Sequence, residues 1–384
     1  MQTGKRIFKT FLIFLTTAIF AVVFSFNNVF ASASEFSFTI IAGEKTYSLS
    51  GEEIGFYKGK KYIKCLEGVV DGVFYDTAVF PKNASLTFTH EKENPFNYQS
   101  EVYGRGINKE KLIEDINLAL CNGENKAFAT FIELVPETLL KDLKKHTYKT
   151  ATFSTFYGNS SSGRKHNIYL ACQKINGTVL ASGEEFSFNK IVGDRTENNG
   201  FKSATVIENG EYLEGVGGGV CQVSTTLYNC ALLSGLKVTK RHAHSIQPIY
   251  VEPSFDAMVS GSAFDLKFVN DTSGNVYIKA VADGSFITFT IYGEKLTKSY
   301  ERVSSELEVI KAPEIKVIED DSLELGKEEW IKFSKDGLKS EGYLKVTDAN
   351  GKVQLIKLHT DVYKSVQGVM KVGTKAVDKA ENIV

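Results

Sequence analysis

The sequence predicts a multidomain α+β protein. Its 384 residues are enough for two or three domains. Phe and Tyr number 27 and 17 against one Trp and only 6 Pro, a balance that favours strands. One strongly periodic helix, near residues 221–234, is followed by short alternating segments between 249 and 291. The simplest architecture for this central part is a helix packed on an antiparallel sheet.

The charge balance gives no sign of nucleic-acid binding. The net charge is −1, and the 42% hydrophobic and 24% charged residues are ordinary for a globular protein.

Residues 1–33 have the pattern of a signal peptide. A basic start is followed by an uncharged apolar run over 11–26 and by Ala31-Ser32-Ala33, a small-x-small cleavage pattern. The basic residues are Lys5, Arg6 and Lys9. An uncleaved membrane anchor is the alternative, and it is the only membrane contact that we expect. Both interpretations place the rest of the chain outside the cytoplasm.

Residues 34–149 are expected to form an α+β domain. Asn108 is expected to be the N-cap residue of a helix that ends near Cys121, and Pro136 opens a short helix. Strands are expected over 36–41, 46–49, 86–89 and 127–135.

Residues 150–295 are expected to form the central domain. A helix covers 164–175, and Asn209-Gly210 turns a hairpin between 203–207 and 211–213. The helix at 221–234 is followed by Gly235, which suits a helix end. Further strands are expected over 186–188, 249–251, 264–269, 276–281 and 286–291.

Residues 300–384 differ in composition and predict a small all-β module. Short alternating segments are separated by recurring glycines, and residues 347–352 form a strong hairpin-turn signal.

The five cysteines fall into three groups. Cys65 and Cys121 are a candidate disulfide, since export permits one. Cys172 and Cys230 lie on predicted helices, and we expect both to be small buried hydrophobes. Cys221 alone has a distinctive setting.

Cys221 directly follows the run 217–220, which contains three glycines, and stands at the predicted start of a helix. The helix dipole and free N–H groups there stabilise a thiolate. His244 follows as a base, and Asp256 or Asp265 can orient it, so the pattern suits thiol catalysis. The alternative is a small thiol buried behind a glycine turn.

The same segment carries a family resemblance. Residues 217–229, followed by His244-Ser245, Tyr250 and Asp256-Ala257, resemble the VanW family, which is named for an accessory protein of B-type vancomycin-resistance clusters. Further blocks match in order at 153–155, 175–177, 183–189 and 193–196. The resemblance covers about residues 150–290.

Both flanks carry resemblances of their own. The segment at 104–108, with 127–136, is similar to a peptidoglycan-binding domain often found before VanW domains. Gly342-Tyr343, residues 350–352 and residues 372–374 resemble the G-five domain, which is linked to cell-wall binding.

Several residues around the motif are expected to bind a ligand. Arg195 can hold a carboxylate or form a surface ion pair, and the Gln222 amide can donate to an oxyanion or tie down the glycine turn. On a strand, His242 would share a face with His244, but no further clustered ligands accompany this pair, so no metal is expected. The run 217–219 lacks the ending of a phosphate loop, so no nucleotide cofactor is expected. The candidate ligand-binding residues are Arg195, Gly218, Gly219, Gln222, Ser224, Thr225, His242, Ser245 and Tyr250.

The resemblance implies an extracytoplasmic cell-envelope protein, secreted or associated with the wall or membrane. Its expected role is to bind peptidoglycan or its precursors, or to act in wall assembly or the glycopeptide response. The alternative is a Cys-His thiol peptidase or acyl transferase that acts on peptidoglycan stem peptides. The sequence gives no oligomeric state.

Overall fold

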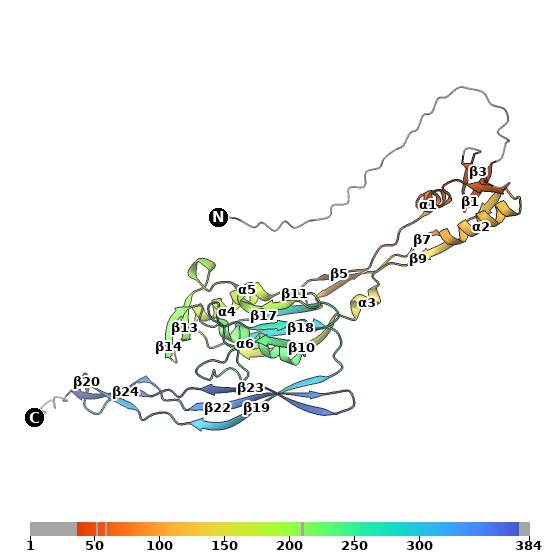
Figure 1. Ribbon diagram of the computed structural model, residues 1–384. Coiled ribbons are helices and arrows are strands. Elements are labelled where there is room, and N and C mark those ends of the chain that lie inside the picture. Colours follow the sequence, from red (N-terminus) through yellow and green to blue (C-terminus); the bar gives the residue numbers. More distant parts are fainter. Residues whose placement is uncertain (1–36, 51–52, 58–59, 209–210, 376–384) are drawn as a thin grey trace, which may run out of the picture. The chain divides into compact units, whose positions relative to one another are not determined.

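The computed structural model describes residues 37–50, 53–57, 60–208 and 211–375 (Figure 1). The predicted signal peptide and the Asn209-Gly210 turn lie outside these residues. The chain divides into two compact units, one of residues 1–79 and 105–133 and one of residues 80–104 and 134–384. The domain predicted at 34–149 is therefore shared between the two units.

The first unit packs two helices against a small sheet. Strand β1 lies between β2, which is antiparallel, and β8, which is parallel. Helix α2 begins as predicted, since the Asn108 side chain accepts a hydrogen bond from the Lys111 N–H at 2.9 Å. The core includes Phe38, Ile40 and Leu112. The elements are β1 (Phe38–Ala42), β2 (Lys45–Leu49), β3 (Ile54–Tyr57), β4 (Lys60–Ile63), α1 (Leu66–Thr77), β7 (Gly104–Ile107), α2 (Lys109–Cys121), β8 (Lys126–Phe128) and β9 (Phe131–Leu134).

Two expectations for this region need correction. Cys65 and Cys121 are free, exposed thiols, so the structure does not contain the suggested disulfide. The strand expected over 127–135 is split into β8 and β9.

The hairpin β5 (Ser85–Phe88) and β6 (Phe96–Gln99) belongs to the second unit for a packing reason. The rings of Phe88 and Phe96 each lie 5.1 Å from the ring of Tyr277. Aromatic contacts of this kind fix the hairpin to the central sheet rather than to the first unit. The short helix expected after Pro136 is α3 (Leu140–Lys144).

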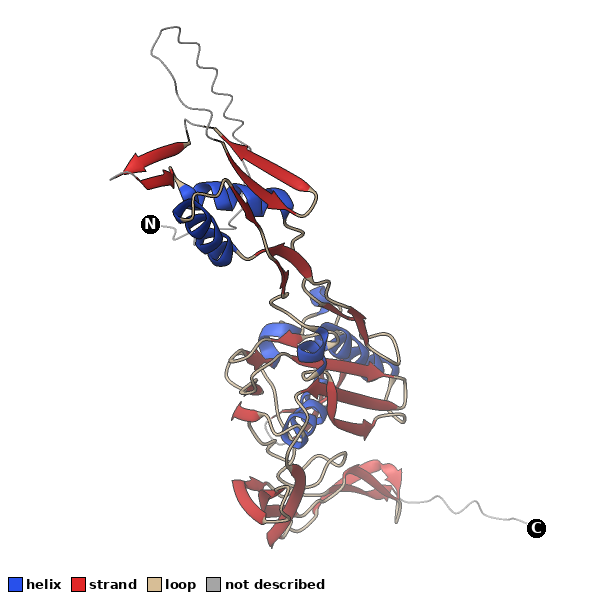
Figure 2. Ribbon diagram, turned by 90° about the vertical axis from the view of Figure 1, so that its right-hand side faces the viewer, coloured by secondary structure: helices blue, strands red, loops and turns tan. Residues whose placement is uncertain are grey.

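The centre of the second unit is the predicted helix-on-sheet arrangement (Figure 2). Four antiparallel strands run in the order β10-β18-β17-β11. Helix α6 packs on β10 and β18, and α4 packs on β17. The elements are β10 (Tyr148–Phe156), α4 (Ser162–Ile175), β11 (Val179–Leu180), α6 (Val220–Leu233), β17 (Val276–Ala282) and β18 (Phe286–Gly293).

A second sheet and a hairpin flank α6. The sheet order is β12-β16-β15, and the predicted hairpin is confirmed by the antiparallel pairing of β13 with β14. The strand expected over 264–269 is shorter, and 249–251 form no strand. The elements are β12 (Glu185–Ser187), α5 (Phe188–Val192), the 3-10 helix η1 (Glu197–Asn199), β13 (Ser203–Glu208), β14 (Glu211–Val216), β15 (Lys237–Lys240) and β16 (Lys267–Val269).

The C-terminal part is all-β, as predicted. It contains the sheets β19-β22-β23 and β20-β24-β21. Asp348 closes the predicted turn, because its Oδ1 accepts from the N–H groups of Asn350 and Lys352 at 2.9 and 3.0 Å. Leu344 and Val346 of β22 join the hydrophobic core that contains α6. The strands are β19 (Ser299–Ile310), β20 (Lys316–Glu324), β21 (Glu328–Lys332), β22 (Gly337–Thr347), β23 (Val353–Tyr363) and β24 (Val369–Lys375).

Candidate active site

Glycines allow the chain to turn sharply into α6. Gly219 is the N-cap residue and has a φ of 103°, which favours glycine. A Cβ on Gly218 would lie 2.6 Å from the Thr205 carbonyl oxygen, and one on Gly219 would lie 2.9 Å from Cγ of Arg164. The turn therefore fits tightly against β13 and α4, and it places Cys221 in the first turn of α6.

The structure brings Cys221, His244 and Asp256 together. The Cys221 thiol lies close enough to the His244 imidazole for each group to shift the pKa of the other, and its Sγ donates to the Val259 carbonyl at 3.4 Å. On the other side of the ring, Nδ1 of His244 lies 2.6 Å from Oδ2 of Asp256, and the His244 N–H donates to the same oxygen at 2.7 Å. His244 and Asp256 are buried, whereas Cys221 is partly exposed. This is the order of groups in a thiol triad.

The three groups stabilise one another's charges. Burial alone would raise the pKa of the Cys221 thiol, but the hydrogen bond to His244 and the charge of its imidazole lower that pKa below its usual value. Burial opposes the imidazolium, yet the hydrogen bonds to Asp256 and Cys221 raise the pKa of His244 to about 9. The arrangement thus favours a thiolate and imidazolium pair.

The other cysteines of the second unit lack this setting. Cys172 and Cys230 are buried, as expected, and burial raises the pKa of each thiol, to about 12 for Cys230. Both remain neutral thiols, so only Cys221 of these three is poised as a nucleophile.

Asp256 has two further partners. Nη2 of Arg241 donates to its Oδ1 at 2.7 Å, and the hydroxyl of Tyr363 donates to the same oxygen at 2.6 Å. Burial would raise the pKa of Asp256, but the hydrogen bond from His244 and the charge of Arg241 hold it well below its usual range. Arg241 also binds Asp361 bidentately at 2.7 and 2.8 Å. Sequence reasoning missed Tyr363 and Asp361, because they lie more than 100 residues further along the chain.

Gln222 ties down the glycine turn. Its Oε1 accepts from Nη2 of Arg164 at 2.8 Å, and its Nε2 donates to Oγ1 of Thr155 at 3.1 Å and to the Phe156 carbonyl at 2.8 Å. Both ends of the amide are therefore occupied within the fold. The N–H of Cys221 itself has no acceptor among the residues that the structure describes.

Ser224 and Thr225 fasten α6 to the segment that carries Asp256. Oγ of Ser224 donates to the Ala257 carbonyl at 2.6 Å, and the Ala257 N–H donates to Oγ1 of Thr225 at 2.9 Å. Thr225 also lies near the phenol of Tyr250 and acts to lower the pKa of that phenol. Burial raises the pKa of that phenol, and negative charge at Cys221 adds to the effect, so Tyr250 lies within electrostatic reach of the thiolate.

His242 and Ser245 differ from expectation because residues 241–250 form no strand. The ring of His242 meets the ring of Phe264 edge-on at 4.9 Å, and its Nε2 is buried with no hydrogen-bond partner among the described residues. The carbonyl of Ser245 accepts from the Lys364 N–H at 2.7 Å. Only His244 of the two histidines reaches the thiol.

Arg195 provides positive charge near Cys221. Its guanidinium lies over the Phe188 ring at 5.6 Å and donates to Oδ1 of Asn189 at 2.5 Å. Burial lowers the pKa of Arg195, while negative charge at Cys221 raises it. The Arg195 guanidinium could therefore bind an anionic group of a ligand near the thiol.

Comparison with known proteins identifies the domains. The model of the family described as "VanW like protein" matches residues 163–292. The central part of the chain is a VanW domain. The G5 domain model matches residues 301–375, and the model described as "Putative peptidoglycan binding domain" matches residues 64–129. The predicted order of the three domains is thereby confirmed.

Two curated relatives match part of the chain. "Uncharacterized protein YoaR" of Bacillus subtilis (strain 168) is 38% identical over 169 residues, which are 42% of this chain and 56% of that protein. "Vancomycin B-type resistance protein VanW" of Enterococcus faecalis (strain ATCC 700802 / V583) is 28% identical over 145 residues, 36% of this chain and 52% of that protein. The chain thus spans about half the length of the curated relatives it matches.

Two solved structures match part of the chain. "IgA1 Protease G5 domain structure" is 20% identical, covers 20% of this chain and 90% of that one, and has a TM-score of 0.15. "Crystal structure of HP0197-G5" is 26% identical, covers 20% and 97%, and has a TM-score of 0.13. Together the three domains are consistent with an extracytoplasmic protein of the cell envelope and with peptidoglycan as a partner.

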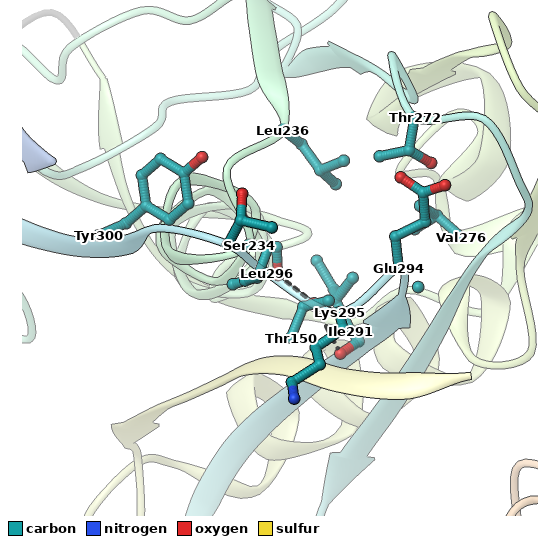
Figure 3. A pocket seen from close by; sticks show the side chains of 12 residues that line it. Thr150, Ser234, Leu236, Thr272, Val276, Ile291, Glu294, Lys295, Leu296 and Tyr300 are labelled. Carbon is teal, nitrogen blue, oxygen red and sulfur yellow. Dashed lines mark hydrogen bonds between the residues drawn. The ribbon is translucent and has the colours of Figure 1, made fainter. Parts of the chain in front are cut away.

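A cavity of about 180 Å³ lies at the far end of α6 in the VanW domain (Figure 3). Ser234, the C-cap residue of α6, lines it with Thr150 and Tyr300, whereas Cys221 is in the first turn of the helix. It contains no cysteine or histidine, so it is separate from the candidate active site.

No group of three or more His, Cys, Asp or Glu side chains suited to a metal ion occurs in the described residues. Within them, no helix is long and apolar enough to cross a membrane.

Proposed function

We propose that this chain is a thiol acyl transferase or peptidase of the cell envelope, with Cys221 as nucleophile and peptidoglycan stem peptides as substrates. The observation that carries the proposal is the placement of Cys221 beside His244, whose Nδ1 lies 2.6 Å from Oδ2 of Asp256. A thiol that is only a small buried residue would need neither the histidine nor the carboxylate. The directions of the Cys221 and His244 pKa shifts support a preformed ion pair, which is the reactive form of such a site.

In the first step the Cys221 thiolate attacks the carbonyl carbon of a peptide bond. The N–H of Cys221, at the start of α6, is free to donate to the oxyanion that forms. The tetrahedral intermediate collapses as the imidazolium of His244 gives its proton to the departing amine. The products are a free amine and a thioester between the acyl group and Cys221.

In the second step an amine or a water attacks the thioester. His244, now neutral, accepts a proton from the attacking group and keeps it, while Cys221 leaves as the thiolate, which restores the ion pair. An amine gives a new peptide bond, so the reaction is transfer, and water gives a carboxylate, so the reaction is hydrolysis. Asp256 keeps Nδ1 of the ring occupied throughout, which leaves the other ring nitrogen to exchange protons in the reaction.

Arg195 and Tyr250 are proposed to hold the substrate. Stem peptides carry carboxylates, and the half-buried guanidinium of Arg195 lies within electrostatic reach of the thiol. The phenol of Tyr250 can donate a hydrogen bond to a group bound beside Cys221.

The wall-binding role is assigned to the flanking domains. The matches at residues 64–129 and 301–375 favour attachment to peptidoglycan rather than catalysis there. Residues 1–33 are proposed as a cleaved signal peptide, so mass spectrometry of the exported protein should find an N-terminus near Ser34. An intact Met1 on membrane-bound protein would instead favour an anchor.

The test of the enzyme proposal is a covalent intermediate. The protein is mixed with purified muropeptides, quenched in acid and mapped by peptide mass spectrometry. We expect an acyl adduct on Cys221, its loss in Cys221→Ser, and its retention in Cys121→Ser, which removes an exposed thiol of the first unit. Wild-type protein that forms neither adduct nor product would leave the VanW domain as a non-catalytic binding or assembly factor.

A further inference from the structure

Residues 241–259 carry His244 and Asp256 but form no helix or strand of their own. A segment without regular structure needs contacts with other parts of the protein to hold its polar side chains in a fixed orientation. Several of those partners come from β22 and β23, the G5 strands that run beside each other in one sheet.

Ser254 is the residue of this segment that two G5 side chains contact directly. Its φ of 64° is uncommon for a residue other than glycine, and the residue is fully buried. Its Oγ is 2.7 Å from Oγ of Ser340, and its carbonyl oxygen is 2.6 Å from Nε2 of His359. A conformation of this kind persists where surrounding contacts determine it.

Tyr363 connects Ser254 to Asp256 through its hydroxyl. The Tyr363 hydroxyl accepts from the Ser254 N–H at 2.7 Å and donates to Oδ1 of Asp256 at 2.6 Å. Oδ1 is thereby bound, which leaves Oδ2 of Asp256 for both donors of His244. Tyr363 is 1% exposed, so water does not compete for these bonds.

Arg241 and Asp361 form a second link between the same partners. Arg241 lies between Asp256 and Asp361 and is hydrogen-bonded to both. Asp361 is on β23, two residues before Tyr363, so one strand contributes both a hydroxyl and a carboxylate to the surroundings of Asp256.

We infer that Tyr363 is a positioning residue for the acyl transfer proposed above: from the G5 domain it fixes the Asp256 carboxylate, and through it the imidazole of His244. This inference rests on the proposed function. It makes the G5 domain part of the catalytic apparatus of the VanW domain, in addition to any role in wall binding. Without the Tyr363 hydroxyl, Oδ1 of Asp256 keeps only Arg241 as a side-chain donor, so the carboxylate orients His244 toward the thiol less firmly.

The test measures the rate of Cys221 alkylation by iodoacetamide from pH 5 to 10, mapped by mass spectrometry, in the full chain. Tyr363→Phe keeps the ring and removes the hydroxyl. We expect the midpoint of its profile to move upward by about one unit, and kcat for muropeptide acyl transfer to fall while KM stays unchanged. Melting curves check that the variant is folded.

Two controls separate positioning from docking. Tyr343→Phe removes a hydroxyl that donates to Glu341, which lies on the same strand, β22, as Tyr343. This hydroxyl makes no bond to Asp256, so the variant should leave the profile unchanged. Ser340→Ala removes a bond between the G5 domain and Ser254 but none to Asp256, and should shift the midpoint less than Tyr363→Phe.

Two results would overturn the inference while leaving the proposed function intact. One is a Tyr363→Phe profile that superimposes on wild type while His244→Ala shifts. The other is an equal shift in Tyr363→Phe and Ser340→Ala. A different result, a wild-type midpoint near about 8.5 that His244→Ala does not change, would refute the proposed function itself.

Discussion

Asp256 collects four donors on two carboxylate oxygens: the N–H and Nδ1 of His244, Nη2 of Arg241 and the Tyr363 hydroxyl. Hydrogen bonds and a nearby cation favour the ionised form of a buried carboxyl. Asp265, the other acid considered from the sequence, binds Oγ of Ser187 and the N–H of Asn189 at the start of α5. The two aspartates thus bind different groups, and only Asp256 is placed to orient His244.

Replacing Asp256 by Asn should lower the pKa of His244. The imidazolium then loses the charge that raises its pKa to about 9, and we expect a fall of about 1–3 units. His244 would become neutral at lower pH, and the thiolate would lose its counterion over the same range. An NMR titration of the His244 ring measures the shift. Asp265→Asn is the matched control and should leave the titration in place, whereas an unchanged His244 in Asp256→Asn would contradict the triad.

The residues of the triad could be named from the sequence because each had a local signal. Cys221 follows a glycine run at a helix start, and His244 and Asp256 fall within a short segment after that helix. For Gln222 the sequence allows two roles, and its contacts with Arg164, Thr155 and Phe156 decide between them. Tyr363 has no local signal, because its role depends on a contact across 107 residues.

At the scale of elements, α6 is a buried helix whose polar side chains form hydrogen bonds inside the protein. Asn229, fully buried, donates to the carbonyls of Thr225 and Phe255 and accepts from Nη1 of Arg302 at 2.8 Å. Bonds of this kind fix the rotation of α6 about its axis. The direction of the Cys221 side chain therefore depends on the whole helix and on the glycine turn before it.

Gly219→Ala should disturb that turn. Its Cβ would lie 2.9 Å from Cγ of Arg164 and 3.0 Å from Cγ1 of Ile168, in addition to the positive φ. Gly183→Ala is a matched control, since Gly183 also has a positive φ but nothing lies within 4 Å of its Cβ. We expect Gly219→Ala to lower the free energy of unfolding by roughly 1–2 kcal/mol more than the control does. Equal losses in urea unfolding would show that packing around the turn is loose.

Elements with strong periodicity and caps, such as α2 and α6, could be predicted, and so could the hairpin β13–β14. The segment 249–251 was wrongly predicted as a strand, since its apolar and aromatic residues match strand propensity. In the structure Ile249 is 93% exposed, while burial raises the pKa of the Tyr250 phenol. Long-range contacts, rather than local propensity, decide the course of this segment.

At the scale of the whole molecule, the VanW and G5 domains lie in one compact unit, and most of the match to the peptidoglycan-binding family lies in the other. Catalysis is proposed for Cys221 of the VanW domain, whereas attachment to the wall is proposed for the peptidoglycan-binding and G5 domains. A change at the triad should leave attachment intact.

Both wild-type protein and Cys221→Ser should therefore co-sediment with purified sacculi at near-physiological salt. The bound fraction, measured by gel densitometry against a tube without sacculi, should be equal for the two proteins. If neither protein sediments with sacculi, the flanking domains are not wall-binding modules under these conditions, and their role as spacers or protein-binding domains is favoured.

The central claim is that His244 and Asp256 activate Cys221, and the five cysteines of one chain provide an internal comparison. The protein is treated with iodoacetamide at about pH 6.5, where an unperturbed thiol is almost entirely protonated, and the labelling rate at each cysteine is read by peptide mass spectrometry. Cys221, although only partly exposed, should be labelled before the exposed Cys65 and Cys121, and His244→Ala should abolish its advantage. Labelling of Cys65 and Cys121 while Cys221 stays unmodified would contradict the account.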